Sequence, residues 1–494
     1  MSNNIQLKES AAVVSDQRYR LNYHLMPPSG WMNDPNGVVY YQGEYHVFYQ
    51  HYPYAPIQGA MHWGHAKSKD LVHWEHLPIA LEPSEAYDSW EGGGASGCWS
   101  GSAVEDDGAL VLMYTGHVDG NTPAEVQCIA RSTDGLCFTK EGANPVIAAS
   151  PIADCFGFRD PKVWKHGEHW HAVIGSGENG IGKALLFRSP DLMQWDYLGP
   201  AAESDGTMGD MWECPDLFPL GDHPEDHVLI FSPMNMGKTK TMYWTGRFDP
   251  EQAAFTRRVA ERVDYGFDFY APQTMVDDRG RRIMFAWMNI WGAKMPEQED
   301  GWMGAFALPR ELKVAEDGTL RFLPVEELRQ LRSGHRHIGE TVLRSGEAVS
   351  YPGLQGDSLE IEAVFRVSPG ASEEASFGFQ VRCSEDGREY AEIAYQPSSE
   401  KLIMDRNHAG AGDGGISDMQ ISPLGDGRIK LHLYIDRTSL ELFVNDGIKT
   451  MTNRIYPDAG STGIRLFSRA GDAVLESLDV WTLSSIWNGK EGEA

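Results

Sequence analysis

Three acidic side chains lie in short motifs whose neighbours are typical of a reactive site. These motifs are WMNDPNG (31–37) with Asp34, FRDP (158–161) with Asp160, and WECPD (212–216) with Glu213. Taken singly, Asp34 could cap a tight turn, Asp160 could pair with Arg159, and Glu213 could be a rim carboxylate. Their joint occurrence beside prolines and aromatic residues predicts that the three act together. Such carboxyl groups can transfer protons and attack an electrophilic carbon.

The composition indicates which ligand this site would take. The chain has 15 tryptophans, and many of them stand beside Gly, Asn and Asp in expected loops. Aromatic faces stack on the C–H faces of sugars, while carboxylates and amides bind hydroxyl groups. The 42 basic and 71 acidic residues give a net charge of −29, which disfavours nucleic acid and anionic membranes as partners. We therefore expect a small-molecule carbohydrate as the partner.

The elements that must position these acids recur along the chain. Five copies of one pattern, two apolar runs joined by a glycine turn, lie between residues 34 and 290 and carry turn glycines Gly43, Gly108, Gly167, Gly221 and Gly280. Units of this size cannot bury their apolar faces alone, so the repeat predicts a five-bladed β-propeller. Asp34 and Asp160 open the first and third copies, and Glu213 lies three residues before the fourth. The repeat would therefore bring all three acids to one axis.

The pattern changes after the repeats, which predicts an all-β chain of two domains. We assign residues 20–322 to the propeller and 323–337 to a linker, in which PVEELRQLR (324–332) is expected to form a short helix. Residues 338–488 show strict alternation, as in 359–365, and an Asn-Asp-Gly turn at 445–447, which is typical of an antiparallel β-sandwich. This second domain has no comparable cluster of reactive residues, and we expect a supporting role for it.

Eight motifs resemble those of a known family. They are WMNDPNG (31–37), FYQ (48–50), HWGHA (62–66), WSGS (99–102), FRDPK (158–162), WECPD (212–216), DFYAPQ (268–273) and GWMGAFALPREL (301–312). In this order they resemble the β-fructofuranosidases, or invertases, of glycoside hydrolase family 32, over nearly the whole chain. The resemblance implies a five-bladed propeller followed by a β-sandwich. It also implies that Asp34 is the nucleophile, Glu213 the acid/base and Asp160 the stabiliser of the transition state.

Retaining hydrolysis requires two carboxyl groups about 5 Å apart, one to attack the anomeric carbon and one to protonate the leaving oxygen. We expect nearby acids and an apolar edge from Trp212 and Cys214 to keep Glu213 protonated. Asp34 should stay ionised through hydrogen bonds from its turn. The neighbouring Arg159 should keep Asp160 charged.

The resemblance also nominates residues that bind the substrate: Asn33, Gln50, Trp63, Trp99, Ser100 and Trp287, with Arg159 within reach of a hydroxyl group. Taken singly, Trp63, Trp99 and Trp287 would more often belong to the core. A metal could be considered at His62, His65, His73 and His76, but they should lie on two strands and a turn without a cysteine or acid cluster. We predict no metal and no cofactor.

The leading functional hypothesis is retaining exo-hydrolysis of sucrose, or of sucrose 6-phosphate, through a covalent fructosyl-enzyme. A fructosyltransferase or fructan hydrolase with the same carboxylates is the alternative, and a non-catalytic sugar-binding propeller is an alternative of another class. The glycine-rich segment Glu91–Gly97 departs from the family and leaves the leaving group open. The N-terminal residues form no apolar segment, and the six cysteines show no metal-type pairing. We therefore expect free thiols and a cytoplasmic protein, whereas the oligomeric state stays open.

Overall fold

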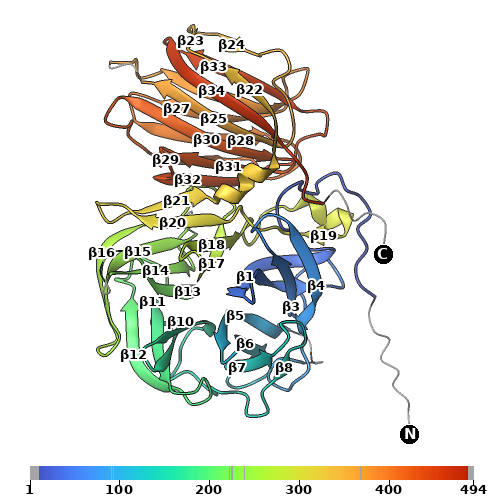
Figure 1. Cartoon of the computed structure of the whole chain (residues 1–494), viewed down its shortest axis with the longest axis vertical. Coiled ribbons are helices and arrows are strands. Elements are labelled where there is room, and N and C mark those ends of the chain that lie inside the picture. Colours follow the sequence, from blue (N-terminus) through green and yellow to red (C-terminus); the bar gives the residue numbers. More distant parts are fainter. Residues whose placement is uncertain are drawn as a thin grey trace.

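The computed structural model describes residues 10–487 except 91, 93, 222, 224, 225, 238, 239, 368 and 369. In this part of the chain all regular elements are strands apart from two short 3₁₀ helices. Figure 1 shows a ring of small sheets with a two-layered β domain stacked against one side. The predicted all-β fold of a propeller and a sandwich is therefore confirmed. None of the helices in the described ranges is long and apolar enough to cross a membrane.

The five predicted repeats form five sheets, or blades, each built of antiparallel strands in chain order. The first blade contains β1 (Gly30–Tyr41), β2 (Glu44–Tyr52), β3 (His62–Ser68) and β4 (Trp74–Leu81). The second contains β5 (Ser96–Asp106), β6 (Ala109–Val118), β7 (Glu125–Ser132) and β8 (Thr139–Lys140), and the third β9 (Phe158–His166), β10 (His169–Glu178), β11 (Ile181–Ser189) and β12 (Asp196–Glu203). The fourth contains β13 (Trp212–Pro219), β14 (Asp226–Pro233), β15 (Met242–Asp249) and β16 (Ala254–Arg262), and the fifth β17 (Tyr270–Val276), β18 (Arg282–Trp287), β20 (Arg310–Val314) and β21 (Leu320–Pro324).

The first strand of every blade faces the centre of the ring, where β1, β5, β9, β13 and β17 contact one another in sequence. The predicted turn glycines all lie between the first and second strands of their blades, and Gly43 and Gly280 adopt φ values of 86° and 76°. A left-handed residue is what a tight hairpin needs, and glycine adopts it without strain. Each copy of the sequence repeat therefore corresponds to the hairpin formed by the first two strands of a blade.

The ring is closed by the segment between β18 and β20. After the 3₁₀ helix η1 (Pro296–Asp300), the short strand β19 (Trp302–Met303) pairs in parallel with β1, with Gly30 opposite Trp302. A strand from the fifth repeat thereby covers the inner edge of the first blade. Closure of this kind leaves no exposed inner edge for pairing with another chain.

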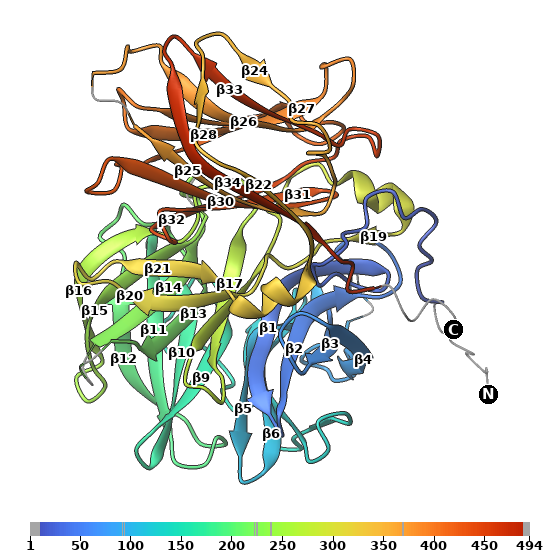
Figure 2. The same cartoon turned by 45° about the horizontal axis from the view of Figure 1, so that its top comes forward.

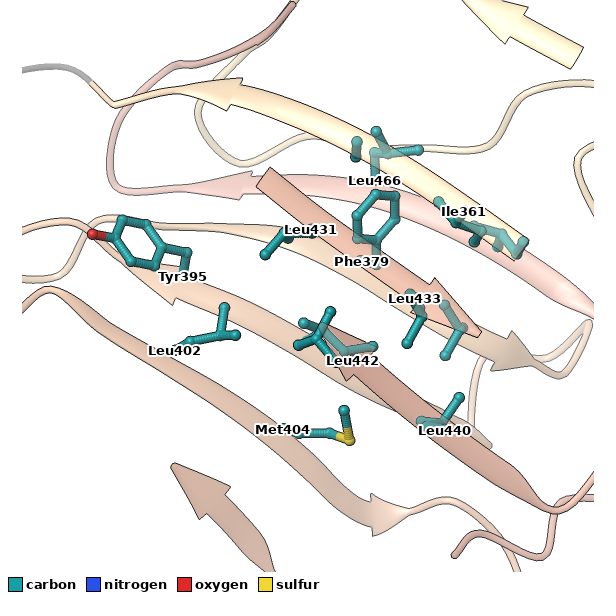
Figure 3. Packing of buried hydrophobic residues seen from close by; sticks show 14 of the residues in the cluster. Ile361, Phe379, Tyr395, Leu402, Met404, Leu431, Leu433, Leu440, Leu442 and Leu466 are labelled. Carbon is teal, nitrogen blue, oxygen red and sulfur yellow. The ribbon is translucent and has the colours of Figure 1, made fainter. Parts of the chain in front are cut away.

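The second domain is a sandwich of two antiparallel sheets. One sheet is built from β22 (Arg332–Ile338), β23 (Thr341–Leu343), β25 (Leu359–Arg366), β30 (Arg428–Asp436), β31 (Ser439–Val444), β32 (Lys449–Arg454) and β34 (Ala473–Leu483). The other is built from β24 (Ala348–Val349), β26 (Ser376–Cys383), β27 (Tyr390–Gln396), β28 (Lys401–His408), β29 (Ile416–Gln420) and β33 (Gly463–Arg469). Phe379 and Leu466 of one sheet pack against Leu431 and Leu442 of the other (Figure 3). The strands alternate because only one face of each sheet is buried in this core.

The joint between the domains differs in detail from the prediction. The expected helix is a 3₁₀ helix, η2 (Glu326–Leu331), which buries Leu328 and Leu331 against the propeller core. Strand β22 already begins inside the predicted linker and pairs with β34. Figure 2 shows β20 and β21 lying beneath the sandwich, and the amide of Phe322 donates to the carbonyl of Gly447 at 2.9 Å. The domain limits at 322 and 338 stay a prediction.

Candidate active site

A cavity of about 550 Å³ lies between the inner strands of the propeller. Its lining includes Asp34 from β1, Asp160 from β9 and Glu213 from β13. The structure thus brings together the three acids that the sequence singled out. Five of the predicted binding residues line the same cavity, namely Asn33, Gln50, Trp99, Ser100 and Arg159.

The inner strands share an irregularity beside the cavity. The pairing register shifts around Pro35 in β1, between Trp99 and Gly101 in β5, and between Glu213 and Asp216 in β13. The tight turn considered for Asn33–Gly37 is therefore a bulged strand. Bulges change the direction of side chains, so one strand can point an acidic side chain into the cavity and a neighbouring side chain into the core.

Asp34 is buried and receives hydrogen bonds from other blades. Its Oδ2 accepts from the Ser100 hydroxyl at 2.9 Å and from the Cys214 thiol at 3.6 Å, while Oδ1 has no hydrogen-bond partner among the described residues. The side chain of Asn33 also forms a hydrogen bond that favours the Asp34 carboxylate, so part of the hydrogen bonding comes from the same motif, as expected. Burial and the charge of Glu213 raise the pKa of Asp34 to about 6, although the Ser100, Asn33 and Cys214 side chains act in the opposite direction.

Asp160 is also buried and accepts from Cys214 through the same oxygen, from the amide at 2.9 Å and from the thiol at 3.5 Å. Burial raises the pKa of Asp160 to about 7, with the nearby charge of Arg159 lowering it and those of Glu213 and Asp34 raising it further. Two neighbouring aspartates therefore titrate close to neutral pH. Such a pair shares its protons rather than titrating as two independent groups.

Glu213 has a polar environment instead of the predicted apolar one. Arg159 donates to its Oε1 from Nε at 3.1 Å and from Nη2 at 2.8 Å, and the Tyr270 hydroxyl donates to Oε2. Trp212 is fully buried between the third and fourth blades, and the Cys214 thiol faces the two aspartates. The expected apolar edge is therefore wrong, because three donors surround this carboxyl group.

The charge of Arg159 favours the ionised form of Asp160, as expected, but the hydrogen bonds of Arg159 go to other carboxyl groups. Its side chain forms no hydrogen bond with Asp160 among the described residues, and its Nη1 donates to Glu125 Oε1 at 3.0 Å. Burial lowers the pKa of Arg159, but the negative charges of Glu213, Glu125 and Asp160 outweigh it and raise the pKa overall. The guanidinium group therefore stays charged between two glutamates.

Two predicted binding residues do not reach the cavity. Trp63 and Trp287 are fully buried. Trp63 donates from Nε1 to the carbonyl of Trp99 at 3.1 Å, and Trp287 packs against Trp291 with ring centroids 5.0 Å apart. These two tryptophans therefore contact residues that line the cavity and do not line it themselves.

Several lining residues were not predicted, and three of them have side chains suited to binding a sugar: Tyr270, Trp291 and Lys240. Tyr270 lies in the DFYAPQ motif, whose place in the order of motifs could have indicated a contact. Trp291 is 41% exposed and lies four residues after Trp287, so the aromatic spacing was a usable signal. Lys240 stands in no motif, and nothing in its sequence context distinguishes it from a surface lysine.

The four histidines considered for a metal have separate partners. His62 contacts the carbonyl of Ala60, His73 contacts Asp70, His65 contacts His46, and His76 stacks on Trp487. Within the described ranges the one group with suitable ligand spacing is Glu360, Glu362 and His432, in the sandwich. Arg332 already pairs with both of these glutamates.

The glycine-rich segment 91–97 is only partly described, since Glu91 and Gly93 lie outside the described residues. The amide of Ala95 donates to Asp119 Oδ2 at 2.7 Å. Ser96 and Gly97 already belong to β5. The hydrogen bond between Ala95 and Asp119 thus connects the end of this segment to the loop after β6. The segment leads directly into β5, the strand that carries Trp99 and Ser100.

Comparisons with known proteins agree over nearly the whole chain. The model of the glycosyl hydrolases family 32 N-terminal domain matches residues 24–324, and that of the family 32 C-terminal domain matches residues 325–482. The chain is 38% identical to a sucrose-6-phosphate hydrolase of Zymomonas mobilis subsp. mobilis, over 97% of this chain and 94% of that protein.

Two solved structures extend these findings. A mutant of the Bombyx mori GH32 beta-fructofuranosidase in complex with sucrose is 35% identical, with a TM-score of 0.81 and coverage of 95% of both chains. Fructan 1-exohydrolase IIa from Cichorium intybus is 26% identical, with a TM-score of 0.83 and coverage of 95% of this chain and 98% of that chain.

Proposed function

The chain belongs to glycosyl hydrolase family 32, and on this premise we propose that it hydrolyses terminal β-D-fructofuranosides with retention of configuration. The observation that carries the proposal is the meeting of Asp34, Asp160 and Glu213 in one cavity. Trp99 and Trp291 line the same cavity and offer aromatic faces for sugar rings. The enzyme is a glycoside hydrolase with a carbohydrate substrate.

In the first step Asp34 attacks the anomeric carbon of the fructosyl unit, and Glu213 gives its proton to the leaving oxygen. Asp34 Oδ1, which has no protein partner among the described residues, is the oxygen suited to attack. Water then hydrolyses the fructosyl ester of Asp34, with Glu213 accepting the proton from water. Asp160 binds sugar hydroxyl groups as the ring becomes oxocarbenium-like. The influence of the Glu213 charge on Asp34 supports the close spacing that retention needs.

The reaction needs one proton on Glu213 and none on Asp34. Burial holds the pKa values of Asp34 and Asp160 near 6 and 7, so the cluster retains a proton close to neutral pH. Substrate hydroxyl groups that bind Asp34 and Asp160 favour their ionised forms, which leaves Glu213 as the site for the proton. Arg159 and Tyr270 then stabilise the Glu213 carboxylate that forms on proton transfer.

The substrate is sucrose or sucrose 6-phosphate, and Lys240 is the residue that can distinguish them. Two basic side chains occur among the described lining residues, and Arg159 is already bound by Glu213 and Glu125. Lys240 is partly buried, which lowers its pKa, while the charge of Asp268 acts in the opposite direction. Among the described residues Lys240 forms no ion pair with a carboxylate. An ammonium group at this position can bind a phosphate on the leaving glucose.

The test compares kcat/KM for the two substrates in wild type and Lys240→Gln. If sucrose 6-phosphate is the preferred substrate, its kcat/KM should fall by about tenfold or more in the variant, because one charge-assisted contact is lost. Sucrose should be affected less. Equal falls for both substrates would remove Lys240 from phosphate recognition.

Fructan hydrolysis or fructosyl transfer is the second candidate, favoured by the likeness to a fructan 1-exohydrolase. Product analysis at high sucrose concentration distinguishes hydrolysis from fructosyl transfer. Equal amounts of glucose and fructose indicate hydrolysis, and an excess of glucose indicates transfer. If wild type releases no glucose or fructose from any β-fructofuranoside tested, the proposed activity is wrong and a non-catalytic sugar-binding propeller gains support.

A cytoplasmic location is also part of the proposal. It is supported by the six cysteines, Cys98, Cys128, Cys137, Cys155, Cys214 and Cys383, all of which are free thiols. We propose that the sandwich domain has a supporting role, since its strands β31 and β32 contact β21 of the fifth blade and the three acids all come from the propeller.

A further inference from the structure

We infer that Glu125 is a positioning residue that fixes Arg159 and balances its charge, so that Glu213 can carry the proton that the leaving group needs. This inference rests on the proposed role of Glu213 as the acid/base. Glu125 itself lies outside the group of residues that line the cavity. It would therefore act through Arg159 and not by touching the substrate.

The contacts form a bridge across three blades. Glu125 begins β7 in the second blade, Arg159 belongs to β9 in the third, and Glu213 belongs to β13 in the fourth. Arg159 donates to Glu125 Oε1 from Nη1 at 3.0 Å, while its Nε and Nη2 point to Glu213. The amide of Phe158 donates to the second oxygen of Glu125. Both oxygens of Glu125 are thus used to hold the residue pair Phe158–Arg159.

The far side of Glu125 is fixed beneath the wall of the cavity. His117 Nδ1 lies 3.5 Å from Glu125 Oε1, and its Nε2 lies 2.9 Å from Asp119 Oδ1. The imidazole ring stacks on Trp99, with centroids 3.5 Å apart and planes 7° from parallel. Glu125 therefore joins the aromatic wall of the cavity to the cation that faces Glu213.

The charge of Glu125 opposes the effect of the Arg159 guanidinium group on Glu213. A guanidinium group that donates two hydrogen bonds favours the carboxylate form, whereas an acid catalyst must hold a proton. Burial would raise the pKa of Glu125, but His117 and Arg159 outweigh it and lower the pKa to about 2. Glu125 is therefore ionised at any working pH and offsets part of the positive charge of Arg159.

The groups that face Glu213 come from every neighbouring inner strand. The charge of Glu213 raises the pKa values of Asp34 of β1 and Asp160 of β9, while Arg159 of β9 and Tyr270 of β17 donate hydrogen bonds to its carboxyl group. Cys214 follows it in β13, with its thiol turned to the aspartates. Without Glu125 the positive charge of Arg159 is no longer offset, and this favours the carboxylate form of Glu213.

The experiment measures the pH profile of kcat/KM for sucrose in wild type, Glu125→Gln and Glu125→Asp. In Glu125→Gln the alkaline limb should move by about one pH unit to lower pH. The variant loses the negative charge that contacts Arg159, the residue that in turn contacts Glu213. Glu125→Asp keeps the charge, and its limb should stay closer to that of wild type. A purely structural role for Glu125 would lower activity without moving the limb, and this result would overturn the inference.

Matched controls complete the experiment. Glu203→Gln also removes one carboxylate from the propeller, at a half-exposed position that pairs with Lys183, and should leave the limb in place. Should Glu125→Gln fail to fold, Glu125→Ser removes the same charge and leaves room for water, and the same shift is expected. If the alkaline limb persists in Glu213→Gln, or if wild type shows no hydrolysis, the proposed function fails. An unmoved limb in Glu125→Gln, with a wild-type limb that depends on Glu213, defeats only the present inference.

Discussion

Arg159 donates two hydrogen bonds to a single oxygen of Glu213, from Nε at 3.1 Å and from Nη2 at 2.8 Å. The other oxygen of Glu213 accepts from Tyr270. This arrangement fixes the direction of the carboxyl group and stabilises the charge that appears when its proton moves to the leaving oxygen. It also means that the acid form depends on the neighbouring charges, which makes activity sensitive to substitutions that do not touch the substrate.

Glu213→Gln should lower kcat for sucrose by about 10²–10⁴-fold, because glutamine cannot supply the proton. A fructoside whose leaving group needs no proton should recover part of that loss. Steady-state assays of both substrates check the prediction. Equal losses on the two would take the acid role away from Glu213.

Tyr270→Phe removes one donor to Glu213 without changing the shape of the ring. Because that donor favours the carboxylate, its loss should move the alkaline limb of kcat/KM to higher pH, the direction opposite to that of Glu125→Gln. Tyr197→Phe, at a 40% exposed position, serves as the control. A limb that stays in place, or moves down, would contradict the contact.

The acidic limb of kcat/KM should lie near pH 6. The nucleophile must be ionised, and burial raises the pKa of Asp34 to about 6, so protonation removes activity below that pH. Ser100→Ala deletes a hydrogen bond that favours the Asp34 carboxylate, so this limb should move to higher pH. An acidic limb near pH 4 in wild type would show that Asp34 is not held in this environment.

Trp63 and Trp99 should respond differently to substitution although both belong to family motifs. Trp63→Phe leaves a gap in a fully buried cluster and should lower stability by about 1–3 kcal/mol with a small change in KM. Trp99→Ala removes part of the cavity wall and should raise KM. Thermal unfolding and kinetics measured on both variants check this. A large increase in KM in Trp63→Phe and none in Trp99→Ala would show that Trp63, and not Trp99, contributes to substrate binding.

The ion pairs of His24 should make the folded protein less stable in alkaline solution. It lies between Asp436 Oδ2 at 2.8 Å and Glu441 Oε1 at 3.0 Å, at the contact between the domains. Burial lowers the pKa of His24, but the two carboxylates outweigh it and raise it to about 8. The folded pKa is above the unfolded value of about 6.5. The contribution, about 2 kcal/mol, is therefore complete below about pH 6.5 and lost as pH rises through about 8.

The measurement is Tm as a function of pH for wild type and His24→Asn. The difference between the two proteins should shrink between pH 6.5 and 9. His73→Asn, at an exposed histidine that pairs with Asp70, should show no such trend. A difference in Tm that does not depend on pH would mean that His24 is not charged in the folded protein.

The sequence predicted the blades because their inner hairpins repeat with glycine turns, and it predicted the three acids because the repeat brings them to one axis. The direction of each side chain was beyond reach. The bulges around Pro35 and Glu213 are set by pairing with the next strand, which a motif does not reveal. Glu125 was missed because its contact depends on a neighbouring blade, 34 residues away at Arg159. Lys240 was missed because it stands in no motif.

Two successive displacements, with Asp34 as the nucleophile, predict a product of retained configuration. The measurement is NMR identification of the product formed when wild type cleaves sucrose in the presence of methanol, which traps the fructosyl-enzyme as a methyl fructofuranoside that does not mutarotate. Attack by Asp34 followed by attack of methanol inverts the anomeric carbon twice. We expect methyl β-D-fructofuranoside from wild type and no product from Asp34→Asn. Methyl α-D-fructofuranoside as the first product would contradict the two successive displacements.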